Sequence, residues 1–355
     1  MVQPGELPEP ESNGDEHVDA SALRPRPELR PDRDDHRHAL RVAVGLLLPA
    51  AVLLAVGRPE LMVYAVFGAF TGMYGRTDTG VPRLWHQLEA AVLLTVGVGL
   101  GVALSALAAP GWALVAVELT FATAASLIAD RLRLRPVGPF FFLFALGATA
   151  TVPRALVAPG VAIGICAGSA ALAVLVGMIG TRGDGSRAPH EPRRLPPGAR
   201  VHAVRYALAV GLGGGVGLLF GFAHANWAMA SAAVPLAAIT VGRPSEGQVR
   251  MVLTRAAHRT VGTLTGLMVA AALLAIGFGP SALAALMVLL LFPTELFMTR
   301  HYAVAIGFFT PLIMLMTELT APSAPLQMLT YRGLDTVIGV VAGVAVAVLV
   351  RSRRP

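Results

Sequence analysis

The sequence predicts an all-α membrane protein with about 12 transmembrane helices, arranged as two parallel six-helix repeats. The first observation is composition: the 355 residues are 55% hydrophobic and 14% charged, with a mean hydropathy of +0.66. Soluble domains are nearer 45–50% apolar and about 25% charged. The second observation is that short patterns recur at a nearly constant spacing, as in duplicated helical bundles.

The recurring patterns lie at the ends of apolar runs. The run His38-Ala-Leu-Arg-Val-Ala opens one apolar stretch, and His202-Ala-Val-Arg-Tyr-Ala opens another 164 positions later. Gly75-Arg76 closes the next run, and Gly242-Arg243 closes its counterpart. Pairs of glycines four residues apart, which let membrane helices approach closely, recur within the spans. These pairs are Gly97/Gly101, Gly164/Gly168, Gly213/Gly217, Gly262/Gly266 and Gly339/Gly343.

Along the chain, residues 1–37 are rich in Pro, Asp, Glu and Arg, and their composition predicts a disordered tail. The first repeat, 38–180, contains spans near 39–57, 61–75, 88–109, 111–130, 136–152 and 157–180. Residues 181–201 form a linker, and 351–355 a basic tail. The second repeat, 202–350, contains spans near 202–222, 226–242, 257–277, 279–298, 301–318 and 329–350. The short spans 61–75 and 136–152 are expected to be less tilted or shielded inside the bundle.

Arginine distribution predicts the orientation. If residue 1 is cytoplasmic, the inner loops and tail carry nearly all loop arginines, and the outer loops carry only Arg58 and Arg154. This bias predicts a multi-pass protein of the inner (plasma) membrane with both termini and the linker in the cytoplasm. Six spans in each half give both repeats the same orientation, related by an axis along the membrane normal.

Several function classes are excluded. The net charge of +7 comes from arginines in short loops, with no basic helix interleaved with aromatics, so no nucleic-acid partner is expected. The sequence shows no catalytic set, Walker A motif, cofactor motif or metal-ligand spacing. The single cysteine, Cys166, lies in an apolar run and reads as a packing residue.

Ionisable residues inside the spans are the candidate functional groups, because burying a charge in a bilayer is costly. Arg332 and Asp335 share a helix face: Arg332 could bind a substrate carboxylate and Asp335 a proton, or the two could neutralise each other. Arg259 could attract anions or anchor its helix at the headgroups. Glu118 could be a proton site or a hydrogen-bonded structural residue. Glu295 is expected to pair with Arg300.

Prolines inside the spans mark a further candidate site. Pro235, Pro293 and Pro311 could break their helices, and broken helices often form binding sites. Thr310, beside Pro311 and next to Phe308 and Phe309, is where an aromatic substrate is expected to bind. The predicted substrate-binding residues are therefore Arg332, Arg259, Phe308 and Thr310, and the predicted proton-coupling residues are Asp335 and Glu118.

Four patterns in the second half, about 202–350, resemble the fusaric acid resistance, or aromatic acid exporter, family. The first is R-x-x-G-T-x-x-G, carried by Arg259, Gly262, Thr263 and Gly266. The others are an apolar helix opening at Trp227, the run from Tyr302 to Pro311, and Arg332-Gly-Leu-Asp335-Thr336-Val-Ile-Gly339. The first half is similar in architecture more than in motif. The resemblance implies export of aromatic or other organic acids, often coupled to protons.

The function expected from the sequence is proton-coupled export of organic carboxylates, in the first place aromatic ones, with no enzymatic activity and no cofactor. A small organic anion and the lipid bilayer are the expected partners, and a homo-oligomer stays open. Two alternatives remain: a passive organic-anion channel, and a membrane scaffold that does not transport and recruits a partner through 1–37.

Overall fold

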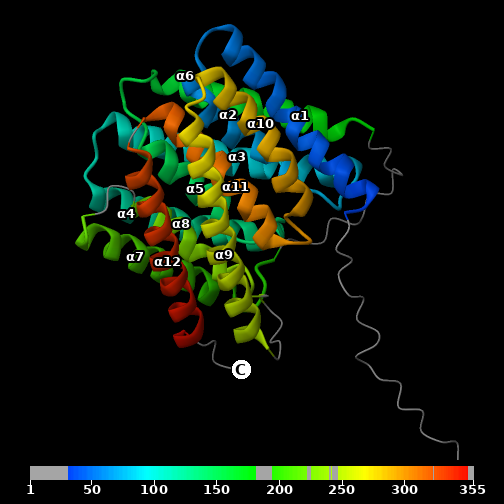
Figure 1. Ribbon diagram of the computed structural model, residues 1–355. Coiled ribbons are helices and arrows are strands. Elements are labelled where there is room, and N and C mark those ends of the chain that lie inside the picture. The colour runs from blue at the N-terminus through cyan, green and yellow to red at the C-terminus, as the bar shows by residue number, and fades with distance from the viewer. Residues whose placement is uncertain are drawn as a thin grey trace, which may run out of the picture.

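A computed structural model of the chain describes residues 31–180, 194–221, 225–239, 241, 247–322 and 324–350 (Figure 1). The described part contains twelve α-helices and two short 3₁₀ helices, and it contains no strand. The prediction of an all-α protein with about twelve helices is therefore confirmed. The predictions for residues 1–30, for 181–193 of the linker, for Gly242-Arg243 and for 351–355 fall outside the described residues.

The helices of the first half are α1 (Arg33–Ala55), α2 (Met62–Ala69), α3 (Gly80–Ala106), α4 (Gly111–Leu132), α5 (Phe140–Ala150) and α6 (Pro159–Met178). The 3₁₀ helices η1 (Pro59–Leu61) and η2 (Phe70–Met73) flank α2. Those of the second half are α7 (Ala199–Leu219), α8 (Ala225–Leu236), α9 (Gln248–Ile276), α10 (Pro280–Phe297), α11 (Tyr302–Thr320) and α12 (Pro325–Leu349).

The first helix begins earlier than the hydropathy pattern indicates. α1 starts at Arg33, so residues 33–37 of the predicted disordered tail are helical. The cause is a capping box: the Asp32 side chain accepts a hydrogen bond from the Asp35 backbone N–H at 2.8 Å, and the Asp35 side chain accepts one from the Asp32 N–H at 3.1 Å. This reciprocal pair satisfies backbone donors that a helix start otherwise leaves unpaired.

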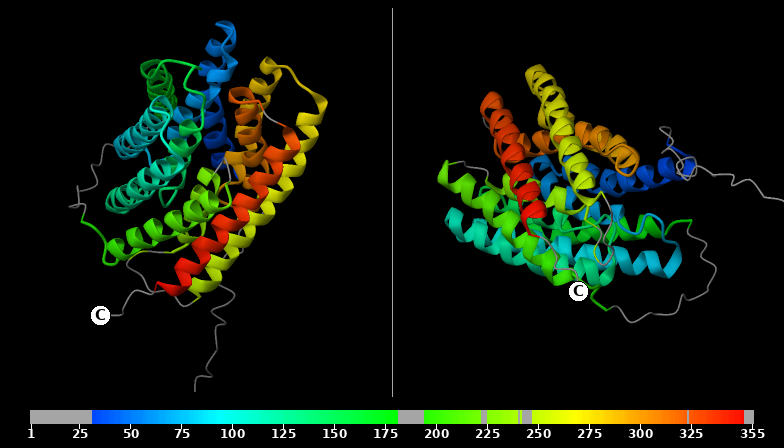
Figure 2. Two further views of the ribbon diagram at one scale, coloured as in Figure 1. Left: turned by 90° about the vertical axis from the view of Figure 1, so that its left-hand side faces the viewer. Right: turned by 90° about the horizontal axis from the view of Figure 1, so that it is seen from below.

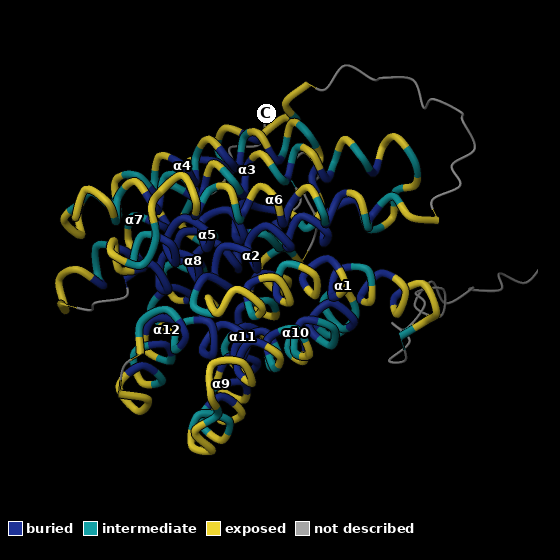
Figure 3. The backbone as a smooth tube through the Cα atoms, turned by 90° about the horizontal axis from the view of Figure 1, so that it is seen from above, coloured by how far each residue is buried: buried dark blue, intermediate teal, exposed yellow. Residues whose placement is uncertain are grey.

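Four helices form the centre of the bundle. Every residue of α2 and α8 is buried, as are all residues of α5 except Ala150, and α11 is mostly buried (Figure 3). Among the described residues, nine helices are long and apolar enough to cross a membrane. The three that are not, α2, α5 and α8, are central helices, so the shielding expected for 61–75 and 136–152 is confirmed. A short helix is tolerated there because protein, not lipid, surrounds its ends.

Glycines set the closest helix contacts. A Cβ on Gly97 of α3 would lie 2.8 Å from the Phe142 carbonyl oxygen of α5, and one on Gly262 of α9 would collide with the Ala303 carbonyl of α11. Gly339 of α12 faces the Ala228 carbonyl of α8 equally closely. The packing role of these pairs is therefore visible. The Gly164/Gly168 pair differs, because nothing lies within 4 Å of a Cβ built on either residue.

The same kinds of helix pair pack in both halves. In the first half α3 packs on α5 and α6, and α2 packs on α6; in the second half α9 packs on α11 and α12, and α8 packs on α12. Between the halves, α1 packs on α10 and α7 packs on α4. Figure 2 shows α9 and α12 side by side along their lengths. The parallel-repeat relation itself stays a prediction, in agreement with this pattern.

The internal prolines do not break the long helices. α10 continues through Pro293 and α11 continues through Pro311, whereas Pro235 lies one residue before the end of α8. Each proline still removes one backbone donor from its helix. Pro293 and Pro311 therefore do not divide their helices into the two half-helices that form binding sites in some transporters.

Candidate functional site

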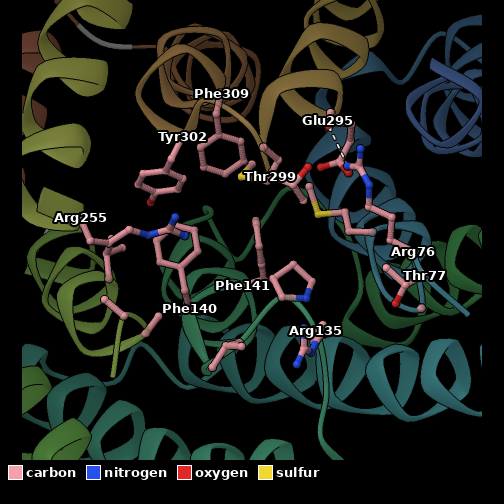
Figure 4. Close-up of a pocket in the computed structure, with 18 of the residues that line it drawn as sticks. Arg76, Thr77, Arg135, Phe140, Phe141, Arg255, Glu295, Thr299, Tyr302 and Phe309 are labelled. Atoms are coloured by element: carbon pink, nitrogen blue, oxygen red, sulfur yellow. Dashed lines mark hydrogen bonds between the residues drawn. The ribbon is translucent and has the colours of Figure 1, made fainter. Parts of the chain in front are cut away.

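A cavity of about 560 Å³ opens where four interhelical connections meet. Its walls come from the segment after η2, the α4–α5 connection, the ends of α8 and α9, and the α10–α11 turn (Figure 4). We call this end of the bundle the arginine-rich end, since Arg76, Arg133, Arg135 and Arg255 line the cavity and, among the described lining residues, only Asp78 and Glu295 supply opposing carboxylates. The volume lies within the range of small-molecule sites.

Aromatic rings form the floor of this cavity. Phe140 and Phe141 of α5 and Tyr302 and Phe309 of α11 line it together. In Figure 4, Arg255 and Tyr302 lie on one side and Arg76 and Glu295 on the other, with Phe141 and Phe309 between them. A cavity with cationic walls and an apolar aromatic floor suits a molecule that carries a negative charge on a flat hydrophobic body.

Three arginines lead from the cavity into the protein, each against an aromatic ring. The Arg255 guanidinium carbon lies 3.3 Å from the Tyr302 ring centroid, and that of Arg259, one turn deeper on α9, lies 4.9 Å from the Phe140 ring. Arg332 on α12 lies 5.7 Å from the Phe144 ring and 5.1 Å from the Trp227 ring. These are cation–π distances. The two helices place positive charges at successive depths along one path, which we call the arginine path.

The deeper two arginines of this path form no ion pair among the described residues. Arg259 and Arg332 are fully buried; the Tyr302 side chain lies within reach of the Arg259 guanidinium, and no guanidinium nitrogen of Arg332 makes a hydrogen bond within the described part of the chain. Guanidinium keeps its charge in proteins, and a buried charge without a partner is strongly unfavourable. Ring faces compensate only part of that cost. The arrangement is therefore one that an anion would complete.

The predicted neutralisation of Arg332 by Asp335 is not made by a hydrogen bond. Both residues lie on α12 and both are fully buried, yet neither carboxylate oxygen of Asp335 has a hydrogen-bond partner among the described residues. Asp335 is near enough to stabilise the arginine charge electrostatically. The acid thus remains available to bind a proton or a solute group.

Glu118 is also buried without a partner, at a junction of three helices. Its α4 side chain lies against α5, where a Cβ on Gly147 would collide with Glu118 Oε1 and would lie 2.7 Å from the Cβ of Asn226 on α8. Asn226 is 1% exposed and both of its amide atoms lack partners. Asn226 is not among the residues predicted from the sequence, although an Asn directly before Trp227 in an apolar run is a signal of the same kind as Glu118.

The structure places Phe308 and Thr310 away from the cavity. Phe308 is half-buried and stacks on Phe297, with ring centroids 6.4 Å apart. Thr310 is fully buried and packs against α9, where a Cβ on Gly266 would lie 2.6 Å from its Cβ. The cavity is lined instead by Phe309, the residue between them. A helix turns by 100° per residue, so the neighbouring ring lies on a different face of α11.

The prediction that Glu295 forms an ion pair with Arg300 is wrong. Glu295 Oε2 lies 3.4 Å from His38 Nε2 of α1. Arg300 instead donates to both acids of the α1 capping box, reaching Asp32 Oδ2 at 2.7 Å and forming a second ion pair with Asp35. Arg76 also pairs with Asp35. The reason is that α1 packs along α10, which brings the start of α1 to the turn after α10.

A second cavity, of about 30 Å³, lies toward the opposite end of the central helices. On α11, Phe309 lines the large cavity and Ile313, one turn later, lines the small one. On α5, Phe141 lines the large cavity and Ala148 the small one. The rings between them, which we call the aromatic plug, are Phe67, Phe70, Phe140, Phe141, Phe144 and Phe309, with neighbouring centroids 5.0 to 6.3 Å apart.

In the described ranges, no group of three or more His, Cys, Asp or Glu side chains is placed so that it could hold a metal ion. Cys166 is buried, and its sulfur lies 4.0 Å from Thr95 Oγ1.

Comparison with known families bears on the second half of the chain. Residues 209–346 match the family described as fusaric acid resistance protein-like. The matched region contains Trp227, Arg259, Arg332 and Asp335, so the resemblance seen in the second half is confirmed. No curated protein and no solved structure matches the chain. The match and the nine long apolar helices together support a multi-pass membrane protein of transporter type.

Proposed function

We propose that this protein exports small organic anions, in the first place aromatic carboxylates, across the inner (plasma) membrane, moving them along the arginine path. The observation that carries the proposal is that Arg259 and Arg332 are fully buried, form no ion pair among the described residues, and lie beyond a cavity of about 560 Å³. Membrane proteins keep buried charges chiefly for function.

Recognition of the substrate follows from the two kinds of side chain on the path. A guanidinium presents a planar set of donors that matches a carboxylate with two parallel hydrogen bonds. The rings of Phe140 and Phe309 offer a flat apolar surface beside Arg255 and Arg259. An aromatic acid would satisfy both at once, with its carboxylate on arginine and its ring against phenylalanine.

Transfer along the path would proceed from one arginine to the next. Arg259 is one helical turn from Arg255, and it lies near enough to Arg332 for their charges to repel. An anion between the two would relieve that repulsion and be held by both. Release toward the small cavity would require the aromatic plug to open, since Phe144 and Trp227 lie against Arg332.

Proton coupling is assigned to Asp335 and Glu118. Both are fully buried acids with no hydrogen-bond partner among the described residues, and Asp335 lies one turn from Arg332. An acid in such a place exchanges a proton when the charge of its neighbours changes. Arrival or departure of an anion at Arg332 is such a change, so Asp335 is the acid expected to respond first.

The plug favours a carrier over a passive channel. Two cavities separated by packed rings describe a protein open at one end, as in alternating access. We propose that the open, arginine-rich end faces the cytoplasm with both termini, because the arginine-rich connections lie there.

The test is uptake of radiolabelled benzoate and hydroxybenzoate into inverted vesicles, with and without an imposed proton gradient. Gradient-dependent accumulation that Arg332→Ala abolishes supports the proposal. Arg250→Ala is the matched control, because Arg250 is an exposed arginine on α9 and should leave uptake unchanged. Equilibration without accumulation would instead identify a channel. Absence of movement, with the protein folded and inserted, would contradict transport of these acids and favour a scaffold.

A further inference from the structure

We infer that His38 and Glu295 form a proton-binding pair in the wall of the large cavity, and that this pair takes up a proton when an anion binds there. The inference rests on the proposed function and adds a site that is separate from Asp335 and Glu118. The two residues are 257 positions apart in sequence. They meet because α1 packs against α10.

The two side chains are buried close together, and several of their polar atoms make no hydrogen bond among the described residues. Glu295 Oε2 lies 3.4 Å from His38 Nε2, and the two side chains are only 3% and 5% exposed. Glu295 Oε1 and both ring nitrogens of His38 have no hydrogen-bond partner within the described part of the chain, so the 3.4 Å approach is an electrostatic contact and not a hydrogen bond. A buried acid would normally have both oxygens satisfied. Because Glu295 also lines the large cavity, its carboxylate is exposed to the field of whatever the cavity holds.

The neighbours keep the pair in place without neutralising it. Arg76 donates to the Glu295 backbone carbonyl at 3.2 Å and directs its other nitrogen to Asp35. Arg300, the nearest other cation in sequence, is committed to Asp32 and Asp35. Tyr74 lies close enough to Glu295 to be affected by its charge. The elements packed on α1 or α10 also carry Cys166 on α6, Tyr64 on α2, Glu60 on η1, which pairs with Arg58, and Tyr302 and Glu318 on α11.

The charge on the pair therefore decides how well the cavity holds an anion. With neutral His38 and ionised Glu295 the pair carries one negative charge, which opposes an anion near Arg76 and Arg255. One added proton, on either residue, makes the pair neutral. Anion binding and proton binding then favour each other, and thermodynamic linkage makes the effect reciprocal. Protonation breaks no hydrogen bond, because Glu295 Oε1 and both ring nitrogens of His38 are unpartnered among the described residues.

Equilibrium binding of benzoate to the purified full-length protein tests this. We expect the dissociation constant to be roughly tenfold smaller at pH 5.5 than at pH 8.5, a range in which a carboxylate with a pKa near 4 stays ionised. Because glutamine carries no negative charge, Glu295→Gln should bind at pH 8.5 at least as tightly as the unaltered protein binds at pH 5.5. Glu318→Gln is the matched control: Glu318 is a partly buried glutamate on α11 outside the large cavity, and its variant should keep the pH dependence.

Proton uptake can be measured on the unaltered protein, so the test does not depend on a variant that folds. Heats of benzoate binding at pH 7 in two buffers with different ionisation enthalpies should reveal net uptake of protons, and His38→Gln should reduce it. Zero uptake would overturn the inference, as would a Glu295→Gln protein that binds benzoate at pH 8.5 no more tightly than the unaltered protein does at that pH. No benzoate binding at either pH would contradict the proposed function itself.

Discussion

Removing the Phe309 side chain should open the aromatic plug. Phe309 is fully buried, and its ring centroid lies 5.9 Å from those of Phe70 and Phe144, 6.1 Å from Phe141 and 6.3 Å from Phe140. Truncating a buried phenylalanine costs about 4 kcal/mol in free energy of unfolding. Four ring contacts of roughly 0.5 to 1.5 kcal/mol each account for much of that loss.

The same truncation should also change function. Phe309 lines the large cavity, and Ile313, one turn along α11, lines the small one. An alanine at 309 therefore leaves a void that joins the two cavities unless the neighbouring rings collapse into it. We expect Phe309→Ala to pass benzoate without a proton gradient and to lose accumulation against a gradient.

Phe308→Ala supplies the comparison on the same helix. Phe308 is half-buried and has one stacked contact, with Phe297, so its loss should cost about 1 kcal/mol and cause no leak. Thermal unfolding in detergent and benzoate equilibration in vesicles measure both effects. Equal stability of the two variants, or a Phe309→Ala protein that still accumulates benzoate, would refute the assignment of Phe309 to the plug.

Three further changes test other contacts. Gly339→Ala places a methyl group against the Ala228 carbonyl; α12 must shift, which should cost about 1 to 3 kcal/mol in thermal unfolding and reduce benzoate binding. Asn226→Leu removes the amide beside Glu118 while keeping the number of side-chain heavy atoms; we expect gradient-driven accumulation to fall roughly tenfold with stability maintained, and unchanged accumulation would remove Asn226 from the site. Asp35→Asn weakens two ion pairs and should lower unfolding free energy by about 2 kcal/mol, whereas an unchanged melting temperature would contradict a stabilising role.

Composition and hydropathy predicted the fold well because lipid imposes a simple rule on the outer helices. A helix that faces lipid must be long and apolar, and α3, α6 and α12 were all visible in this way. The central helices obey another rule. α5 has eleven residues, ten of them buried, so its length is set by the surrounding protein. The hydropathy pattern did not predict where α1 begins, because a capping box of two aspartates, and not apolar residues, fixes that position.

The candidate site was predictable in part. Arg259, Arg332, Asp335 and Glu118 stand out because charge is rare in apolar spans, and the structure buries all four. Which face of a helix meets the cavity is harder to obtain, since it depends on neighbours that are far apart in sequence. Phe308 and Phe309 are adjacent and chemically identical, yet only Phe309 lines the cavity. The ring partners of the arginines likewise come from α5, α8 and α11, and local spacing does not reveal them.

Local sequence patterns do not predict which helices of the two halves contact each other. The constant spacing between the repeats does predict some of these contacts. His38 and His202 are 164 positions apart, and Asp130 and Glu295 are 165 apart. If the first helix of each half packs on the fourth helix of the other, His38 must approach Glu295 and His202 must approach the Asp130 region. The structure packs α1 on α10 and α7 on α4. His38 contacts Glu295, while Tyr206, which lies 4.7 Å from the His202 ring, is near enough to Asp130 to be affected by its charge. The two junctions thus share a plan but differ in their contacts: among the described residues, His38 directly contacts an acid at the α1–α10 junction, whereas the ring packed on His202 at the α4–α7 junction is that of a tyrosine.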